Sequence, residues 1–204
     1  MVNIGRQGLA ADVARPPNAS GVVIFAHGSG SSRMSPRNRL VARALNQAGL
    51  ATVLFDLLTA EEAEDRRNVF DIPLLARRVG DAIAAVREND VLCHMRIGLF
   101  GASTGAAAAL SAAAGEGEDI AAVVSRGGRP DLAMDILDAV RAPTLLIVGG
   151  LDDEVITLNE RAFARLRVPL LAGRSDAPAL LDARQELLPV GGDLVVVHLG
   201  GDRL

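Results

Sequence analysis

The sequence predicts an α/β fold, a doubly wound and mostly parallel sheet with helices on both of its faces. Short, continuous apolar runs recur along the chain, as expected for strands that are buried on both faces of a parallel sheet. Amphipathic helical patterns separate these runs. Strand and helix therefore alternate, and this alternation is typical of a parallel sheet covered by helices on both sides.

The first strands and the first helix of this pattern are readable before residue 60. Gly21–Ala26 is a continuous apolar run, and His27–Ser32 after it is a glycine- and serine-rich loop. Pro36 suits the first turn of a helix, because its missing N–H needs no partner there. Ala51–Phe55 is the next strand, and it ends at Asp56. The apolar stripe of the intervening helix consists of Leu40, Val41, Ala44, Leu45 and Ala48.

The middle of the chain contains a polar segment, a long helix and another strand. Glu61–Asn68 is strongly polar, and we expect it to be an exposed loop. Asp71 is a candidate N-cap for the helix that follows. Arg96–Phe100 is a short apolar run that predicts the next strand. The helix between them shows apolar residues at steps of three and four, at Ile72, Leu75, Val79, Ile83 and Val86.

The last elements complete the alternating pattern. Ile120–Val124 and Pro143–Val148 predict two further strands, and Ile156–Leu166 predicts a helix after them. Leu9–Ala14 is expected to form an antiparallel edge strand ahead of the others. The sequence contains no linker or internal repeat, so it predicts one domain over residues 1–204. The C-terminal part of this domain is expected to be incomplete or divergent.

Composition excludes several classes of function. Half of the 204 residues are apolar and the net charge is −4, so no basic surface for nucleic acid is expected. The single cysteine, Cys93, cannot form an internal disulfide, and one cysteine with three histidines makes a zinc site improbable. The N-terminus lacks the apolar core of a signal peptide, and no apolar stretch reaches membrane-spanning length. We therefore expect a cytoplasmic protein without metal or organic cofactor.

The most informative motif is Gly101-Ala102-Ser103-Thr104-Gly105. It follows the Arg96–Phe100 run directly and leads into the alanine-rich segment Ala106–Ala114. This order predicts a strand, a sharp turn and a helix, with Ser103 at the apex of the turn. Such a turn exposes a serine hydroxyl and points the helix N-terminus at the charge that develops during acyl transfer. A glycine-rich turn with a solvated serine is the alternative interpretation.

Further candidate residues follow the ends of other predicted strands, where the sites of open parallel sheets lie. Asp152 is the candidate acid that orients a catalytic histidine, with Asp153 as its competitor and helix capping as the alternative role. The backbone N–H groups of Thr104 and Ser29 are the candidate oxyanion hole. Arg126 is a candidate for binding an anionic substrate group, and an ordinary ion pair is the alternative.

Four segments resemble the dienelactone-hydrolase-like branch of the α/β-hydrolases. The resemblance implies a doubly wound sheet and hydrolysis of esters or related acyl compounds by a Ser–Asp–His triad, with Ser103 as nucleophile and Asp152 as acid. The best-known dienelactone hydrolases use a cysteine nucleophile, so dienelactone itself is not implied as substrate. The segments are VVIFAHGSGSSRMSPRNR from Val22, IGLFGASTGAAAAL from Ile97, VSRGGRPDL from Val124 and PTLLIVGGLD from Pro143, and they lie within residues 21–166.

The tail, residues 167–204, departs from the family pattern, because the family's histidine loop after the acid is missing. An altered reading frame is one explanation, and a plausible helix over Ala179–Leu188 precedes a valine-rich run. His198, in that run, is the candidate base because it follows Asp152 in the required order. His27 matches the histidine that braces the family's oxyanion loop, and His94 is expected at the surface away from the site.

The sequence therefore favours a serine hydrolase that cleaves small esters or lactones, acting as a monomer or homodimer. A catalytically impaired α/β-hydrolase-fold protein is the second hypothesis, since a serine without a base is a poor nucleophile. The third is a phosphate- or nucleotide-binding domain, suggested by Arg33, Arg37 and Arg39 beside two serines. It is the minor alternative because the chain lacks the phosphate-loop and dinucleotide-binding motifs.

Overall fold

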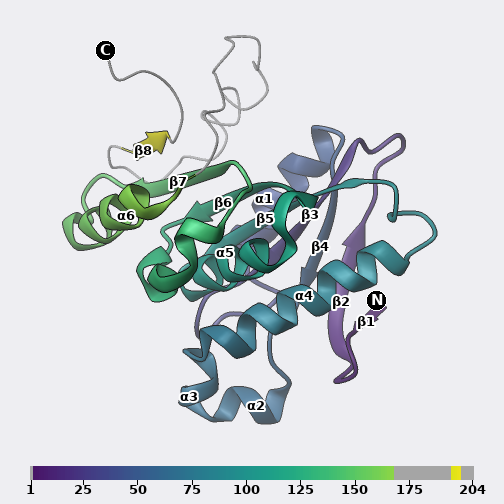
Figure 1. The fold of residues 1–204 in the computed structure, drawn as a ribbon. Helices are drawn as coiled ribbons and strands as arrows, with labels where there is room; N and C mark the ends of the chain where they lie inside the picture. The colour runs from purple at the N-terminus through teal and green to yellow at the C-terminus, as the bar shows by residue number, and fades with distance from the viewer. Residues whose placement is uncertain (1, 168–193, 199–204) are drawn as a thin grey trace.

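A computed structural model describes residues 2–167 and, by backbone alone, residues 194–198. Its described strands form one eight-stranded sheet with the order β1-β2-β4-β3-β5-β6-β7-β8 (Figure 1). The predicted tail helix over Ala179–Leu188 lies outside the described residues. The strands are β1 (Val2–Ile4), β2 (Leu9–Ala14), β3 (Gly21–Ala26), β4 (Ala51–Phe55), β5 (Arg96–Ala102), β6 (Ile120–Arg126), β7 (Thr144–Gly149) and β8 (Leu194–His198).

The centre of the sheet is parallel, as the sequence predicts. Strands β3 to β7 pair in parallel, whereas β1, β2 and β8 pair antiparallel with their neighbours. The prediction of an antiparallel strand at Leu9–Ala14 is confirmed, although β1, which the sequence did not predict, lies outside it at the edge. Because β3, β5, β6 and β7 run side by side in one direction, the loops after them all emerge at the same edge of the sheet.

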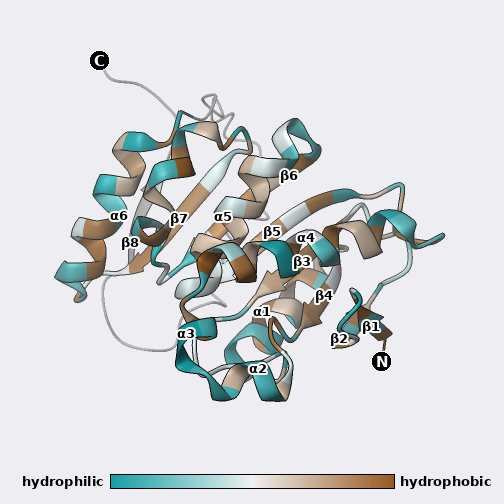
Figure 2. Cartoon of the chain, turned by 60° about the horizontal axis from the view of Figure 1, so that its bottom comes forward, coloured by the Kyte–Doolittle hydropathy of each residue, from teal (hydrophilic) through white to brown (hydrophobic). Residues whose placement is uncertain are grey.

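Helices cover both faces, which confirms the doubly wound architecture. Helix α1 packs on one face, where Val41 and Ala42 meet Phe25 and Phe100 of the central strands. Helices α4, α5 and α6 contribute to the larger apolar core on the other face. In Figure 2 the central strands are mainly hydrophobic, whereas α6 alternates between hydrophobic and hydrophilic residues. The helices are α1 (Pro36–Gln47), α2 (Ala60–Glu64), α3 (Arg66–Val69), α4 (Ile72–Glu88), α5 (Thr104–Glu116) and α6 (Asp153–Arg165).

The polar segment 61–68, expected to be a loop, instead forms the two short helices α2 and α3. Local capping explains the difference. Thr59 and Glu62 form a reciprocal capping box, and the Asp65 carboxylate accepts from the Arg67 N–H at 2.9 Å. Neither helix has a buried residue, so its stability comes from these polar contacts rather than from an apolar stripe. The prediction of a loop was therefore wrong, because it considered the polarity of the segment and not its capping residues.

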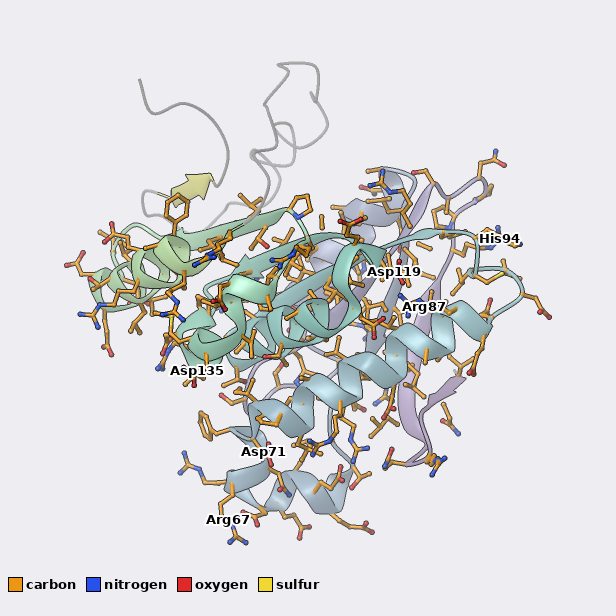
Figure 3. All side chains as sticks on the ribbon, viewed as in Figure 1. Arg67, Asp71, Arg87, His94, Asp119 and Asp135 are labelled. Carbon is orange, nitrogen blue, oxygen red and sulfur yellow. The ribbon has the colours of Figure 1, made fainter. Side chains whose placement is uncertain are left out.

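Two ion pairs tie the far end of α4 to the end of α5. Arg87 contacts Glu116 at 2.6 Å and Asp119 at 3.1 Å, and Figure 3 labels Arg87 and Asp119 on these neighbouring elements. A 3₁₀ segment, Pro130–Ala139, follows β6 and was not predicted. None of the described helices is long and apolar enough to cross a membrane.

Candidate active site

Ser103 lies at the turn between β5 and α5, as the sequence predicts. Its backbone has φ 52° and ψ −126°, in a region that residues other than glycine rarely adopt. Asn18 is the other described non-glycine residue with positive φ. Such a conformation costs on the order of 1–3 kcal/mol and persists only where the surroundings impose it. A strained serine between a strand and a helix is the geometry of a nucleophile turn.

The glycines around Ser103 are required by close packing. A Cβ on Gly105 would overlap the backbone carbonyl oxygens of Ala26 and His27 at the end of β3. A Cβ on Gly101 would overlap the backbone of Ala106 in the first turn of α5. Gly28 is tight as well, because its Cβ would lie 2.8 Å from the Ser103 Cβ. The turn is therefore pressed directly against the loop after β3.

His27 braces that loop and is not available as a base. Its Nε2 accepts a hydrogen bond from the Leu57 N–H at 3.1 Å, so its proton is on Nδ1, which donates to the Gly28 carbonyl oxygen at 3.0 Å. Burial lowers the pKa of His27, partly offset by the Gly28 contact and the charge of Asp56. The ring is thus held neutral with both nitrogens engaged, which supports the bracing role expected from the sequence.

The candidate oxyanion-hole residues, Ser29 and Thr104, line the same cavity. Thr104 is the first residue of α5, and the N–H groups of a first helical turn have no partner within the helix. Its side chain is buried, and its hydroxyl oxygen has no hydrogen-bond partner among the described residues. Ser29 belongs to the loop that packs against Ser103. The two residues therefore contribute to one cavity wall beside the turn at Ser103.

The cavity beside these residues has a volume of about 270 Å³ and lies between the loop after β3 and the helices α2 and α3. Its wall is largely apolar, and one side of it comes from the segment that the sequence analysis expected to be a loop. Arg78 of α4, itself buried, fixes α2 by a 2.6 Å ion pair with Glu62. The apolar wall consists of Leu57, Leu58, Ala60, Ala63, Val69 and Leu75.

Asp152 follows β7, at the same edge of the sheet as Ser103, and it caps α6. Its carboxylate accepts a hydrogen bond from the Val155 N–H at 3.2 Å, and the side chain is exposed. Asp153, the competing candidate, is the exposed first residue of the helix. The structure thus shows the capping role directly, and an orienting role for Asp152 stays a prediction.

The remaining histidines do not meet Asp152 within the described backbone. His94 is exposed beyond the C-terminal end of α4. In Figure 3 it lies far from Asp71, which caps the other end of that helix. His198 pairs with Leu145 near the start of β7, whereas Asp152 follows the other end of that strand. The four residue steps from Leu145 to Gly149 span about 13 Å. The strand register therefore argues against His198 as the catalytic base.

A loop between β6 and the 3₁₀ segment supports the turn at Ser103, a role that was not predicted from the sequence. The Arg129 N–H donates to the Ser103 carbonyl oxygen at 3.1 Å. One residue earlier, the Gly128 carbonyl oxygen accepts from the side chain of Asn159 at 3.0 Å. Asn159 is fully buried in α6, so it connects the helix that Asp152 caps with the turn that presents Ser103. The Gly127-Gly128 pair was the only local signal of this close packing.

The arginines singled out by the sequence differ in their partners. Arg33 forms an ion pair with Asp56, and Arg39 lies 3.6 Å from Asp12. These contacts give both residues structural roles and weaken the case for a phosphate site there. Arg126 is the last residue of β6, as predicted, and none of the ion pairs between described residues includes it. No group of three potential metal ligands occurs within residues 2–167.

A family model described as an alpha/beta hydrolase domain matches residues 19–161. The chain belongs to the alpha/beta-hydrolase family. A crystal structure of dienelactone hydrolase from Anabaena variabilis is 48% identical, with a TM-score of 0.80, over 91% of this chain and 92% of that one. This similarity places the hydrolase in the dienelactone-hydrolase-like branch. An alpha-beta serine hydrolase homologue from Coxiella burnetii, with a TM-score of 0.67 and 19% identity over 92% and 94% of the two chains, shares the fold.

Two curated relatives come from Mycobacterium tuberculosis strains H37Rv and CDC 1551, and both are named as a phosphoribosyl transferase. Each is 56% identical over 156 residues, which is 76% of this chain but 35% of the relative. This hydrolase therefore spans about a third of the length of those proteins. Their name describes a much longer chain, whereas the matched part supports an enzyme of the hydrolase kind.

Proposed function

We propose that this alpha/beta hydrolase cleaves small esters or lactones through an acyl-enzyme on Ser103. The strained turn at Ser103, packed between three glycines and followed by the free N-terminus of α5, is the observation that carries the proposal. In the reaction, the Ser103 oxygen bonds to the substrate carbonyl carbon and the ester C–O bond breaks. The serine proton passes through a base to the leaving alcohol, and water then releases the acid.

The surrounding residues have complementary roles in this proposal. The backbone N–H groups of Thr104 and Ser29 stabilise the oxyanion, because both line the cavity next to Ser103. Asp152 orients the base, and Arg126 contacts the substrate from the neighbouring strand. No step requires a metal or an organic cofactor. The apolar cavity of about 270 Å³ suits an acyl or alcohol group of only a few carbon atoms.

The positions of the histidines favour a second candidate, a catalytically impaired hydrolase. The chain has three histidines. His27 has both ring nitrogens engaged, His94 lies beyond the end of α4, and His198 pairs with Leu145 at the start of β7. A serine hydroxyl without a neighbouring base keeps its proton at neutral pH. Turnover would then be lower by orders of magnitude, with residual catalysis from the oxyanion hole.

Hydrolysis of p-nitrophenyl acetate and butyrate separates the two candidates. We expect turnover by the wild-type protein that is lost in Ser103→Ala, together with covalent labelling of Ser103 by a fluorophosphonate. Loss of turnover in His198→Ala as well would place the base in the tail, against the strand register. His94→Ala is the matched control, because that exposed residue lies away from the turn. Wild-type turnover no faster than that of Ser103→Ala would establish the impaired protein.

A further inference from the structure

Arg126 occupies the strand position next to the nucleophile turn. In the parallel register of β5 and β6, Arg126 lies opposite Ala102, the residue before Ser103. Neighbouring strands are about 4.8 Å apart, so the backbones of Arg126 and the turn are in direct proximity. A cation at this position is within reach of a substrate whose carbonyl group is at Ser103.

The charge of Arg126 has no acidic partner among the described residues. One Nη donates to the Asn38 side-chain oxygen at 3.2 Å, and the guanidinium lies 6.0 Å from the centre of the Phe100 ring. Its Nε is buried without a hydrogen-bond partner. Arg129, three residues later, shows the usual arrangement, because its Nε and one Nη each donate to an oxygen of the Asp131 carboxylate at 2.8 Å. The guanidinium of Arg126 is thus oriented by a neutral amide and an aromatic ring.

A second cation reinforces the first. Arg37 immediately precedes Asn38 in α1, its side chain is exposed, and no ion pair between described residues includes it. Burial and the nearby charge of Arg37 both lower the pKa of Arg126, burial more strongly. Arg126 has a buried Nε without a partner, and neither guanidinium forms an ion pair with a described carboxylate. The two positive charges therefore attract an anion, and they match a dianion best.

We infer that Arg126 and Arg37 form a binding site for a dianionic group of the phosphate class, at the end of β6 next to the turn that carries Ser103. The bound anion completes the hydrogen bonds of the Arg126 guanidinium and offsets its repulsion with Arg37. Deepening the proposed function, this site makes the preferred substrate a small ester or lactone that carries a phosphate or phosphonate group. Binding of the anion itself requires no catalysis and therefore holds for an impaired hydrolase as well.

Titration calorimetry with inorganic phosphate tests the site in the Ser103→Ala protein, at constant ionic strength set with chloride because charge pairing depends on salt. We expect saturable binding of one phosphate, weakened at least tenfold in Arg126→Met. Arg126→Lys retains part of the affinity because it keeps the charge. Arg43→Met is the matched control, since Arg43 is exposed on α1, the helix that also carries Arg37. We expect this variant to leave the affinity for phosphate unchanged.

Several outcomes would overturn the site: no saturable phosphate binding, tighter binding of acetate than of phosphate, or equal weakening by Arg43→Met and Arg126→Met. Esterase assays keep this result separate from that of the proposed function. Phosphate binding without any Ser103-dependent turnover would retain the site and reject the hydrolase. Turnover of p-nitrophenyl acetate without phosphate binding would retain the hydrolase and reject the site.

Discussion

The turns that follow β5 and β7 both emerge at the edge of the sheet that holds the candidate site, yet they are built differently. Around Ser103, added Cβ atoms at Gly28, Gly101 and Gly105 would all meet neighbouring atoms closer than real contacts allow. After β7, a Cβ on Gly149 would meet nothing within 4 Å, and Leu151 is 82% exposed. Tertiary packing therefore imposes the first turn, whereas local hydrogen bonds shape the second.

This difference teaches which part of the candidate site tolerates change. The strained backbone of Ser103 persists because atoms from β3, α5 and the loop after β6 surround it. Asp152 is held by three local hydrogen bonds. Its own N–H donates to the Gly149 carbonyl oxygen, its carbonyl oxygen accepts from the Ile156 N–H, and its carboxylate accepts from the Val155 N–H. Divergence in the loop after β7, or beyond α6, can thus alter the acid and the base while leaving the turn at Ser103 intact.

The largest expected effect is at Gly105. Gly105→Ala places a methyl group against two backbone carbonyl groups that cannot rotate away, so we expect a loss of at least about 3 kcal/mol in the free energy of unfolding. Gly115→Ala, in the same helix, meets no atom within 4 Å and is expected to gain about 0.5–1 kcal/mol from helix propensity. Urea denaturation of both variants measures the difference, and equal stabilities would refute a turn imposed by packing.

Asp152 is expected to show a large effect on rate and a small one on stability. Asparagine caps helices as well as aspartate does, so Asp152→Asn keeps the stability of α6 but removes the charge that orients a base. If Asp152 is the acid, ester turnover falls by a factor on the order of 10³–10⁴. Asp152→Ala also loses about 1 kcal/mol of stability, because the cap is gone.

Asp153→Asn is the control for this prediction, since it changes the neighbouring charge at the exposed start of α6. Turnover should stay at the wild-type level in Asp153→Asn. Full activity in Asp152→Asn would reduce Asp152 to a helix cap, and the two turns would then differ in function as well as in construction.

Asn159 tests whether the two turns are coupled. Asn159→Leu removes the donor to the Gly128 carbonyl oxygen and is expected to destabilise the protein by about 1–3 kcal/mol. The loop that bonds the Ser103 carbonyl oxygen loosens, so we expect the Arg129 amide to exchange with deuterium about tenfold faster. Asn46→Leu is the matched control, because Asn46 also donates two side-chain hydrogen bonds, to Leu50 and Thr52. Equal exchange of Arg129 in both variants would exclude the coupling.

The sequence predicts the nucleophile turn well because the information for it is local. The apolar run before Gly101 and the alanines after Gly105 specify a strand and a helix, and the glycines between them permit the turn. The sheet and its five parallel strands follow from the same local signals. Helices α2 and α3 form in a polar segment because Thr59 and Asp65 cap their N-termini, and these capping residues are also local in the sequence.

Contacts between residues far apart in the chain left no comparable signal. Asn159 is separated from Gly128 by 31 residues, and a buried asparagine in an amphipathic helix does not show which carbonyl group it bonds. The pairing of His198 with Leu145 likewise depends on strand order and direction, and a valine-rich run shows neither. Arg126 was placed correctly at a strand end, but its lack of an acidic partner within residues 2–167 emerged only from the packing.

The smallest expected effect is a pH dependence of the free energy of unfolding. It arises from His27, in the loop that packs against the turn at Ser103. Burial lowers the pKa of His27 below its ordinary value of 6.5, so the unfolded chain binds a proton more readily than the native one. The contribution of the neutral ring is complete above pH 6.5 and is lost as the pH falls from there toward the native pKa, by up to about 1.4 kcal/mol per pH unit. Urea denaturation between about pH 5 and 7.5 measures this slope. His27→Gln removes the titration of this ring and flattens the profile. A profile unaffected by His27→Gln would mean that the native ring takes up a proton as readily as the ring in the unfolded chain does. A protonated ring cannot accept the hydrogen bond from the Leu57 N–H, on which the loop beside Ser103 depends.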